Sequence, residues 1–382
     1  MFALLLLAGI AVGSRLSAQA EPPVHSSASS KVLVLGVVGS ASRSLAATSP
    51  DDFLRGIRVW QAHLKTASGT VFDPNVARSV RVIVASTGSS ASSRLAAVTV
   101  LARSGVSAIL TPSPSPVVLR IGQRFHVPVL SSAVPKSLLA TDRFAFSLSP
   151  SRLGDPQLLY NAMRGLLISR RRRLRIAIVA GKGWAAIGQQ ASQLAQQQGI
   201  ESKLTTARGS DPRSALAQAR RFGADLLYVL ARPALVVSWQ RRYRRSSDPP
   251  WATTLSAGSD PGTVGRPLLA AVQWNPFTSQ GGMIFSAGTF TADYEKAYNA
   301  LPGTSAAEGA ASALAVSAAV GIAHSTGPAR IAAALAEIAA PSLFGELQFH
   351  RQAQAEGPPA GLLLIRGSAV TQTTSLPSRK GR

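Results

Sequence analysis

The sequence predicts an α/β protein built from two Rossmann-like lobes that face each other across a cleft. The first observation is a set of short, continuous apolar runs, such as Lys31–Gly39 and Val127–Leu130, which are typical of buried strands. The second is that segments of helical period separate these runs, as in a parallel sheet. The third is that the same order restarts near Arg175–Ala180, and 382 residues are enough for two lobes.

The first half opens with the strand expected at Lys31–Gly39. The motif SPDD at residues 49–52 then marks a helix start, with a Ser N-cap, Pro at the first helical position and acids in the first turn. The other elements expected in this half are a helix at Ser92–Ser104 and strands at Arg81–Ala85, Ala108–Leu110, Val127–Leu130 and Phe144–Leu148.

The second half repeats the alternation and then adds a helical return. Its expected helices are Leu158–Ile168, Gln189–Gln198, Asp211–Phe222 and Ala234–Arg245, followed by Ala292–Leu301, Ala306–Ala323 and Ala329–Ala339. Its expected strands are Arg175–Ala180, Asp225–Ala231, Thr253–Ala257, Leu268–Trp274, Phe344–His350 and Gly361–Arg366. Residues 369–382 are Ser/Thr-rich and basic, which predicts a disordered tail.

The N-terminus predicts an exported protein. Phe2–Val12 is an apolar segment of the length found in signal peptides, and the sequence AQA at residues 18–20 is a suitable cleavage site, although no Lys or Arg precedes the apolar segment. We therefore expect residues 1–20 to be removed. No later run reaches about 18 uninterrupted apolar residues, so we expect a soluble mature protein. Without any cysteine there is no lipid-modified N-terminal Cys, which favours the periplasm of a cell with two membranes.

The composition also limits the function. The formal net charge is +23, but the basic residues are scattered without an aromatic platform, so we expect no nucleic-acid partner. The cluster at Arg170–Arg173, with Arg175, is either a solvated face or a contact for lipid headgroups or an acidic partner. The absence of cysteine excludes disulfides, thiolate metal sites and a Cys nucleophile.

Enzymatic motifs are missing. The five histidines are dispersed without metal-ligand spacing, and GxGxxG, P-loop and GxSxG motifs do not occur. The 17 acids form no compact pair. We therefore expect no catalytic residue, no metal and no cofactor.

Small hydroxyl residues follow the strands of the first half. In parallel sheets, ligands bind at the carboxyl ends of the strands. Ser113, Ser115, Ser131 and Ser132 follow two expected strands, and hydroxyls with free backbone N–H groups are suited to binding rather than catalysis. Ser115-Pro116 has the form of an N-cap with Pro at the first helical position. Ser115 thus either caps its helix or holds an anion at the helix N-terminus, and the two roles are compatible.

Several phrases, in their order along the chain, resemble one family. They are VLGVVGS at residues 34–40, DDFLRGIRVW at 51–60, GVSAILTP at 105–112, VPVLSSAV at 127–134, LLATDRFAFSLSPS at 138–151, FGADLLYVLARPALVVSWQRR at 222–242 and FGELQFHRQAQ at 344–354. The chain resembles the type I periplasmic binding proteins of the branched-chain amino acid (Leu/Ile/Val-binding) group, which serve ABC importers. The resemblance implies three crossings between lobes. Lobe one would hold residues 31–150 and 281–340, and lobe two residues 151–280 and 341–368.

The resemblance also implies a ligand site between the lobes. The ligand-binding residues carried over from it are Ser113, Ser115, Ser132, Ala133, Trp184, Arg232 and Asp260. Pro135 stands where the family has a threonine, and GKGW at residues 181–184 replaces an aspartate–tyrosine–glycine turn. Lys182 and Arg232 are then either solvated rim residues or signs of a ligand with more negative charge than leucine.

The function implied is that of a periplasmic solute-binding protein. It would capture a small polar or anionic ligand, such as an amino acid, amide or carboxylate, and deliver it to an ABC permease in the inner membrane, acting as a monomer. The alternative is a sensor or regulator on the same fold that presents its lobes to a membrane protein, because a fold alone does not separate the two.

Overall fold

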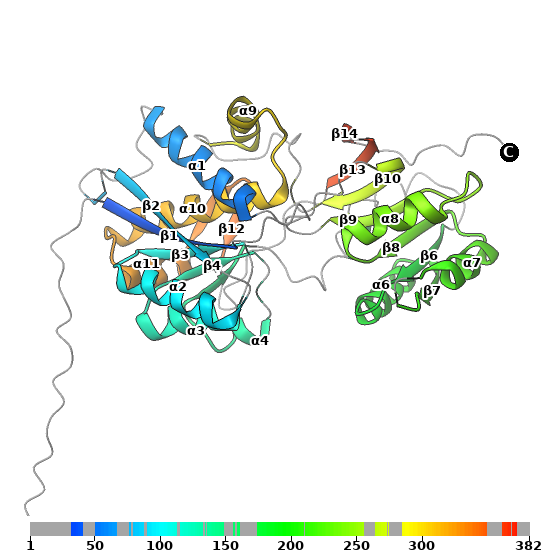
Figure 1. Ribbon diagram of the computed structural model, residues 1–382, viewed down its shortest axis with the longest axis horizontal. Helices are drawn as coiled ribbons and strands as arrows, with labels where there is room; N and C mark the ends of the chain where they lie inside the picture. The colour runs from blue at the N-terminus through cyan, green and yellow to red at the C-terminus, as the bar shows by residue number, and fades with distance from the viewer. Residues whose placement is uncertain are drawn as a thin grey trace, which may run out of the picture.

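The computed structural model describes residues 32–40, 50–66, 76–77, 79–87, 90–112, 115–132, 134, 136–148, 156, 159–160, 174–209, 211–255, 264–272, 274, 285–349, 361–367 and 369–372. These residues form two α/β units, each around its own sheet, and the units lie next to each other along the longest axis (Figure 1). The predicted fold class is therefore confirmed. The expected signal peptide lies outside the described residues, as does the expected helix at residues 158–168 apart from Leu159 and Tyr160, which are helical.

The first unit contains a five-stranded sheet in the order β2-β1-β3-β4-β5. Its strands are β1 (Val32–Ser40), β2 (Ser79–Thr87), β3 (Ala108–Thr111), β4 (Val129–Ser131) and β5 (Ala145–Ser147). All neighbouring strands pair in parallel. Their carboxyl ends therefore meet at one edge of the sheet, the edge where ligands bind in such folds.

Helices cover both faces of this sheet because its strands are apolar on both sides. In β1, Leu33, Leu35 and Val37 pack on one face, whereas Val34 and Val38 pack on the other. The second of these faces is covered by α2 (Ala91–Arg103) and α3 (Pro116–Phe125), which lie together below the sheet in Figure 1, and near them is the short α4 (Lys136–Leu139). The first face is covered by α1 (Pro50–Thr66), α9 (Ala287–Tyr298), α10 (Thr304–Ala323) and α11 (Pro328–Glu337).

Two glycines allow α1 and α10 to pack unusually closely. A Cβ atom added to Gly56 would lie 1.8 Å from the carbonyl oxygen of Ala306, and one added to Gly309 would lie 2.1 Å from the carbonyl oxygen of Phe53. By length and composition α10 is apolar enough to cross a membrane, but 72% of its apolar window is buried inside the protein. In the described part of the chain it is thus the central core helix of the first unit.

The second unit contains a seven-stranded sheet in the order β14-β13-β10-β9-β8-β6-β7. Its strands are β6 (Arg175–Ala180), β7 (Glu201–Thr206), β8 (Leu226–Leu230), β9 (Trp251–Leu255), β10 (Val264–Val272), β13 (Gly361–Gly367) and β14 (Ala369–Gln372). The strands from β6 to β10 pair in parallel, whereas β13 and β14 are antiparallel additions. Helix α6 (Ala185–Gln197) packs on one face, and α7 (Arg213–Phe222) and α8 (Pro233–Tyr243) pack on the other.

The structure differs from the expected division in three places. The hairpin of β11 (Ala339–Ser342) and β12 (Gly345–Gln348) follows α11, and its residues join the core of the first unit, although residues 341–368 are expected in lobe two. Trp274 also packs in that first core, with its ring 5.8 Å from Phe290. Residues 369–372 form β14 instead of belonging to a disordered tail, because β13 offers them an unpaired strand edge. The remaining boundaries of the two lobes stay a prediction.

Candidate ligand-binding site

Three hydroxyl residues form a row at the carboxyl edge of the first sheet. Thr111, Ser131 and Ser147 are the last residues of β3, β4 and β5, and the strand register pairs Thr111 with Ser131 and Ser131 with Ser147. All three are buried, with exposed fractions of 3%, 0% and 0%. The sequence supplies one hydroxyl residue at the end of each strand. Because parallel strands end at the same edge of the sheet, the strand register then aligns the three hydroxyl residues in a row.

Ser147 holds the turn that follows β4. Its hydroxyl donates to the carbonyl oxygen of Ser132 at 2.7 Å and accepts from the backbone N–H of Val134 at 2.9 Å. The backbone N–H of Leu148 also donates to the carbonyl of Ser131 at 2.9 Å. These bonds tie the turn to β5 and fix its backbone in place.

Ser132 makes a bond that the sequence does not predict. Its hydroxyl donates to the Glu308 carboxylate, with 2.6 Å between Oγ and Oε2, and the two residues are only 2% and 1% exposed. The hydroxyl proton of Ser132 is therefore donated to Glu308 on α10, whereas the sequence predicts that Ser132 contacts the ligand. That the Ser132 residue binds the ligand stays a prediction. Glu308 was detectable only as the one acid in the Ala-rich stretch TSAAEGAASALAV at residues 304–316.

Unlike the hydroxyls of Ser132 and Ser147, the hydroxyl of Ser131 is unpaired in the described structure. Its Oγ is fully buried, and no hydrogen-bond partner for it occurs in the described structure. Buried hydroxyls are rarely left unpaired, since the loss of their hydration costs about 1–3 kcal/mol. The position is thus one where a ligand group or an ordered water is strongly favoured.

Ser115 occupies the N-cap position of α3, with Pro116 beginning the helix. Its backbone has the extended conformation of a cap (φ −129°, ψ 127°), and its carbonyl accepts from the N–H of Leu119 at 3.0 Å. Its side chain makes no capping hydrogen bond, so the expected cap by the Ser115 hydroxyl is wrong. The first N–H groups of α3 are consequently not capped by this side chain, which suits a helix N-terminus that meets a ligand.

In the second unit, Trp184 and Arg232 lie at the carboxyl ends of two neighbouring strands, β6 and β8. Trp184 is the N-cap residue of α6, and its half-buried ring packs on the core beside that helix. Arg232 is the exposed N-cap residue of α8, with its carbonyl accepting from Leu235 and Val236 at 2.8 and 3.0 Å. The three other predicted ligand-binding residues, Ser113, Ala133 and Asp260, lie outside the described residues.

The edges of both sheets therefore share one chemistry. Each combines helix N-termini, which carry partial positive charge, with polar groups at the ends of parallel strands. Among the described residues no group of three or more His, Asp or Glu side chains is arranged to hold a metal ion. Such edges are suited to holding a small polar molecule through hydrogen bonds.

A sequence model of one family, described as "Periplasmic binding protein", matches residues 33–362. The chain belongs to the periplasmic binding protein family. Its fold is similar to that of solved substrate-binding proteins. One is an ABC transporter substrate-binding protein from Desulfitobacterium hafniense in complex with Leu, with 16% identity and a TM-score of 0.69 over 90% of this chain and 100% of the other.

Two further structures are similar to this periplasmic binding protein. A putative branched-chain amino acid ABC transporter protein from Silicibacter pomeroyi has 17% identity and a TM-score of 0.71, with 91% and 98% of the two chains covered. A branched-chain amino acid transporter substrate-binding protein from Streptococcus pneumoniae, in complex with isoleucine, has 17% identity and a TM-score of 0.65, with 90% and 99% covered. No curated protein sequence matches significantly.

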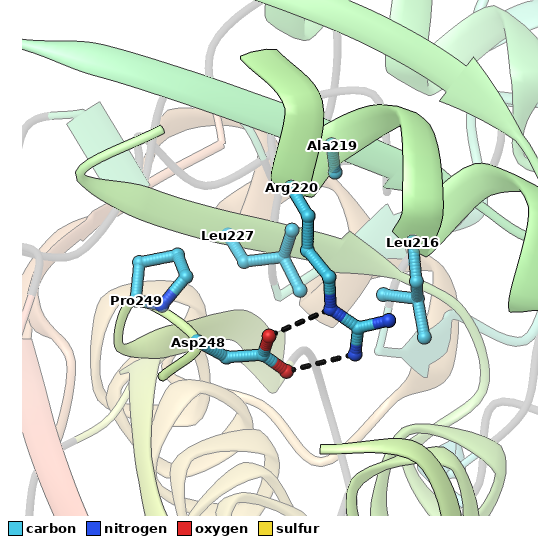
Figure 2. Close-up of a pocket in the computed structure, with 6 residues that line it drawn as sticks. All are labelled: Leu216, Ala219, Arg220, Leu227, Asp248 and Pro249. Atoms are coloured by element: carbon cyan, nitrogen blue, oxygen red, sulfur yellow. Dashed lines mark hydrogen bonds and ion pairs between the residues drawn. The ribbon is translucent and has the colours of Figure 1, made fainter. Parts of the chain in front are cut away.

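A small pocket of this periplasmic binding protein lies at the opposite edge of the second sheet. It is lined by Leu216, Ala219, Arg220, Leu227, Asp248 and Pro249 (Figure 2). Leu227 is near the start of β8 and Pro249 lies two residues before β9, so the pocket is at the amino ends of the strands. Its polar groups are already paired, as Arg220 donates to Asp248 through Nε at 2.7 Å and Nη2 at 3.0 Å. This ion pair is structural.

Electrostatics support the structural role of that pair. Burial raises the pKa of Asp248, but the hydrogen bonds from Arg220 and from the backbone N–H of Arg245 outweigh it and hold the pKa below its ordinary value. The carboxylate is therefore charged and fully engaged at neutral pH. It is not available to a ligand.

Proposed function

We propose that this periplasmic binding protein captures a small polar ligand between its two lobes and delivers it to an ABC permease. The observation that carries the proposal is the in-register row of Thr111, Ser131 and Ser147. In this row the buried Ser131 hydroxyl has no hydrogen-bond partner in the described structure. Helix N-termini beside the strand ends of both units support it. Further support comes from similar structures that are named as complexes with Leu and isoleucine.

The Ser132–Glu308 bond narrows the class of ligand. Glu308 places carboxyl oxygens next to the turn after β4, and carboxyl oxygens accept hydrogen bonds, so this turn favours a ligand that offers a hydrogen-bond donor. Amino acids and amides offer a hydrogen-bond donor as well as an acceptor, so they fit this edge better than a simple carboxylate does. The guanidinium of Arg232, exposed just after β8, can donate hydrogen bonds to the carbonyl or carboxylate oxygen of such a ligand.

We further propose that residues 1–20 are the signal peptide that takes the chain to the periplasm, where it acts as a monomer. The ligand would hold the two lobes in a closed arrangement, because it contacts both and binds that arrangement preferentially. Small-angle scattering should then show a smaller radius of gyration with ligand than without it.

A thermal-shift screen tests the function directly. The purified chain is heated with amino acids, their amides and simple carboxylates, and hits are confirmed by calorimetric titration. A ligand at 100 times its dissociation constant stabilises the folded state by about 2.7 kcal/mol, which is a readily measured rise in melting temperature. If carboxylates raise the melting temperature and amino acids and amides do not, the preferred class is wrong. If no compound of any of the three classes binds, the proposed capture function is wrong.

A further inference from the structure

The amino edge of the second sheet, opposite the carboxyl ends, gathers arginine side chains. Helices α7 and α8 end at this edge, and β10 begins there, since its Leu268 pairs with the first residue of β9. Several exposed arginines stand at these positions, and we call four of them the basic edge: Arg221, Arg242, Arg245 and Arg266. It is distant along the strands from the ends where a ligand is proposed to bind.

The acids at this edge are already engaged. In the described part of the chain they are Glu201 at the start of β7, Asp225 directly before β8 and Asp248 three residues before β9. Glu201 pairs with Arg175 at 3.1 Å, and Asp225 accepts from the backbone N–H of Arg175 at 3.1 Å. Asp248 accepts from Arg220 and from the backbone of Arg245. No acid in this described set remains to neutralise the basic edge.

The cations also crowd one another. Arg244 lies beside the basic edge, where burial and the charge of Arg266 lower its pKa by more than the charge of Asp248 raises it. Its guanidinium is held in place by donating to the carbonyl of Pro267. Like charges so close raise the electrostatic free energy of the free protein, and an anionic partner relieves that repulsion.

The side chains at the basic edge suit neither a protein partner nor a single-stranded nucleic acid. Protein interfaces need apolar anchors at their centre, but the exposed large apolar side chains of the described structure are Val84, Leu95, Val100, Leu301 and Ile322, all in the first unit. Nucleic acids that are bound without base pairing stack on open aromatic rings. Two half-buried rings of the described structure at this edge are already covered, Tyr243 by Arg242 at 5.5 Å and Phe222 by Arg175 at 4.3 Å.

We propose that the basic edge docks the protein onto a membrane surface of anionic phospholipids. Guanidinium groups bind phosphate oxygens through paired hydrogen bonds, and a layer of headgroups presents many phosphates without demanding an apolar contact. The chain belongs to a family described as periplasmic, and the periplasm is bounded by membranes. Docking through the amino edge leaves the carboxyl ends of both sheets available for the ligand.

Vesicle co-sedimentation tests this proposal. The full chain is mixed with vesicles of phosphatidylcholine alone, or of phosphatidylcholine with phosphatidylglycerol, at low and at physiological salt. We expect binding only to the anionic vesicles, weakening as salt rises. The triple substitution Arg242→Gln, Arg245→Gln and Arg266→Gln should lower the affinity roughly fivefold per arginine, on the order of 100-fold in all.

A matched control has the same net charge. Arg58→Gln, Arg103→Gln and Arg330→Gln neutralise three exposed arginines of the first unit and should leave vesicle binding nearly unchanged. Circular dichroism and melting temperature establish that both triple variants are folded. Equal losses in the two variants would show that total charge, not the basic edge, drives binding and would overturn the proposal. So would an absence of binding to anionic vesicles, or tighter binding to single-stranded DNA at the same salt. The ligand affinity of the basic-edge variant, measured separately, tests the proposed capture function independently.

Discussion

Ser131 and Ser147 are register neighbours on β4 and β5, and truncating Ser147 to alanine should destabilise the fold whereas truncating Ser131 should not. Both side chains are fully buried, so the two substitutions remove the same atom from similar surroundings. The Ser147 hydroxyl makes two hydrogen bonds, to Ser132 and from Val134, whereas the Ser131 hydroxyl has no partner in the described structure. Ser147→Ala leaves a buried carbonyl and N–H unpaired and should cost about 1–3 kcal/mol.

Ser131→Ala removes an unpaired buried hydroxyl instead. Without ligand it should be neutral or stabilise the folded state by about 1 kcal/mol, because the penalty for burying that hydroxyl disappears. With ligand it should weaken binding by about 0.5–1.5 kcal/mol, the net contribution of one hydrogen bond. Chemical denaturation of both variants in the ligand-free state measures the first effect, and calorimetric titration with the ligand from the screen measures the second.

Two results would refute this reasoning. If Ser131→Ala destabilises the ligand-free protein as much as Ser147→Ala does, the Ser131 hydroxyl is satisfied in the free protein, for example by an ordered water. If Ser131→Ala leaves ligand affinity unchanged, the ligand does not reach the row and the candidate site is misplaced. Retained folding by circular dichroism is required of both variants.

Three further predictions follow from the structure. Ser115→Ala should leave the melting temperature unchanged, because its hydroxyl caps nothing, but should weaken ligand binding by about 1 kcal/mol if it contacts the ligand, as titration will show. Gly56→Ala should destabilise the chain by several kcal/mol, about 3 or more, because its Cβ would overlap the Ala306 carbonyl; denaturant unfolding would contradict this if the loss were under about 1 kcal/mol. The lowered pKa of Asp248 means that its contribution to stability is present above the unfolded value near 4 and is lost as the pH falls through the folded value. Denaturation across pH 2–7 should therefore show a shallower acid loss for Asp248→Asn than for the wild type, and equal slopes would be incompatible with a lowered pKa.

The sequence alone determined the fold class because burial leaves a local pattern. Strand β1 is apolar at every position from Val32 to Val38, which is what a strand covered on both faces requires, and it is found where expected. The same holds for the start of α3, where the pair Ser115-Pro116 stands at the N-cap and first helical positions. These signals depend on neighbours in sequence, so one chain was sufficient to find them.

The tertiary structure decided what each polar group does. The bond from Ser132 to Glu308 joins residues 176 positions apart, and no local pattern announces it. The alignment of Thr111 with Ser131 and Ser147 likewise depends on the register of three strands, and the loss of the expected Ser115 cap depends on how one hydroxyl is oriented. Hydrogen bonds are directional and short, so a pairing between distant segments is set by packing to within a fraction of an ångström. Burial is not directional, and a pattern of apolar residues is therefore enough to predict a sheet but not the partners of its hydroxyls.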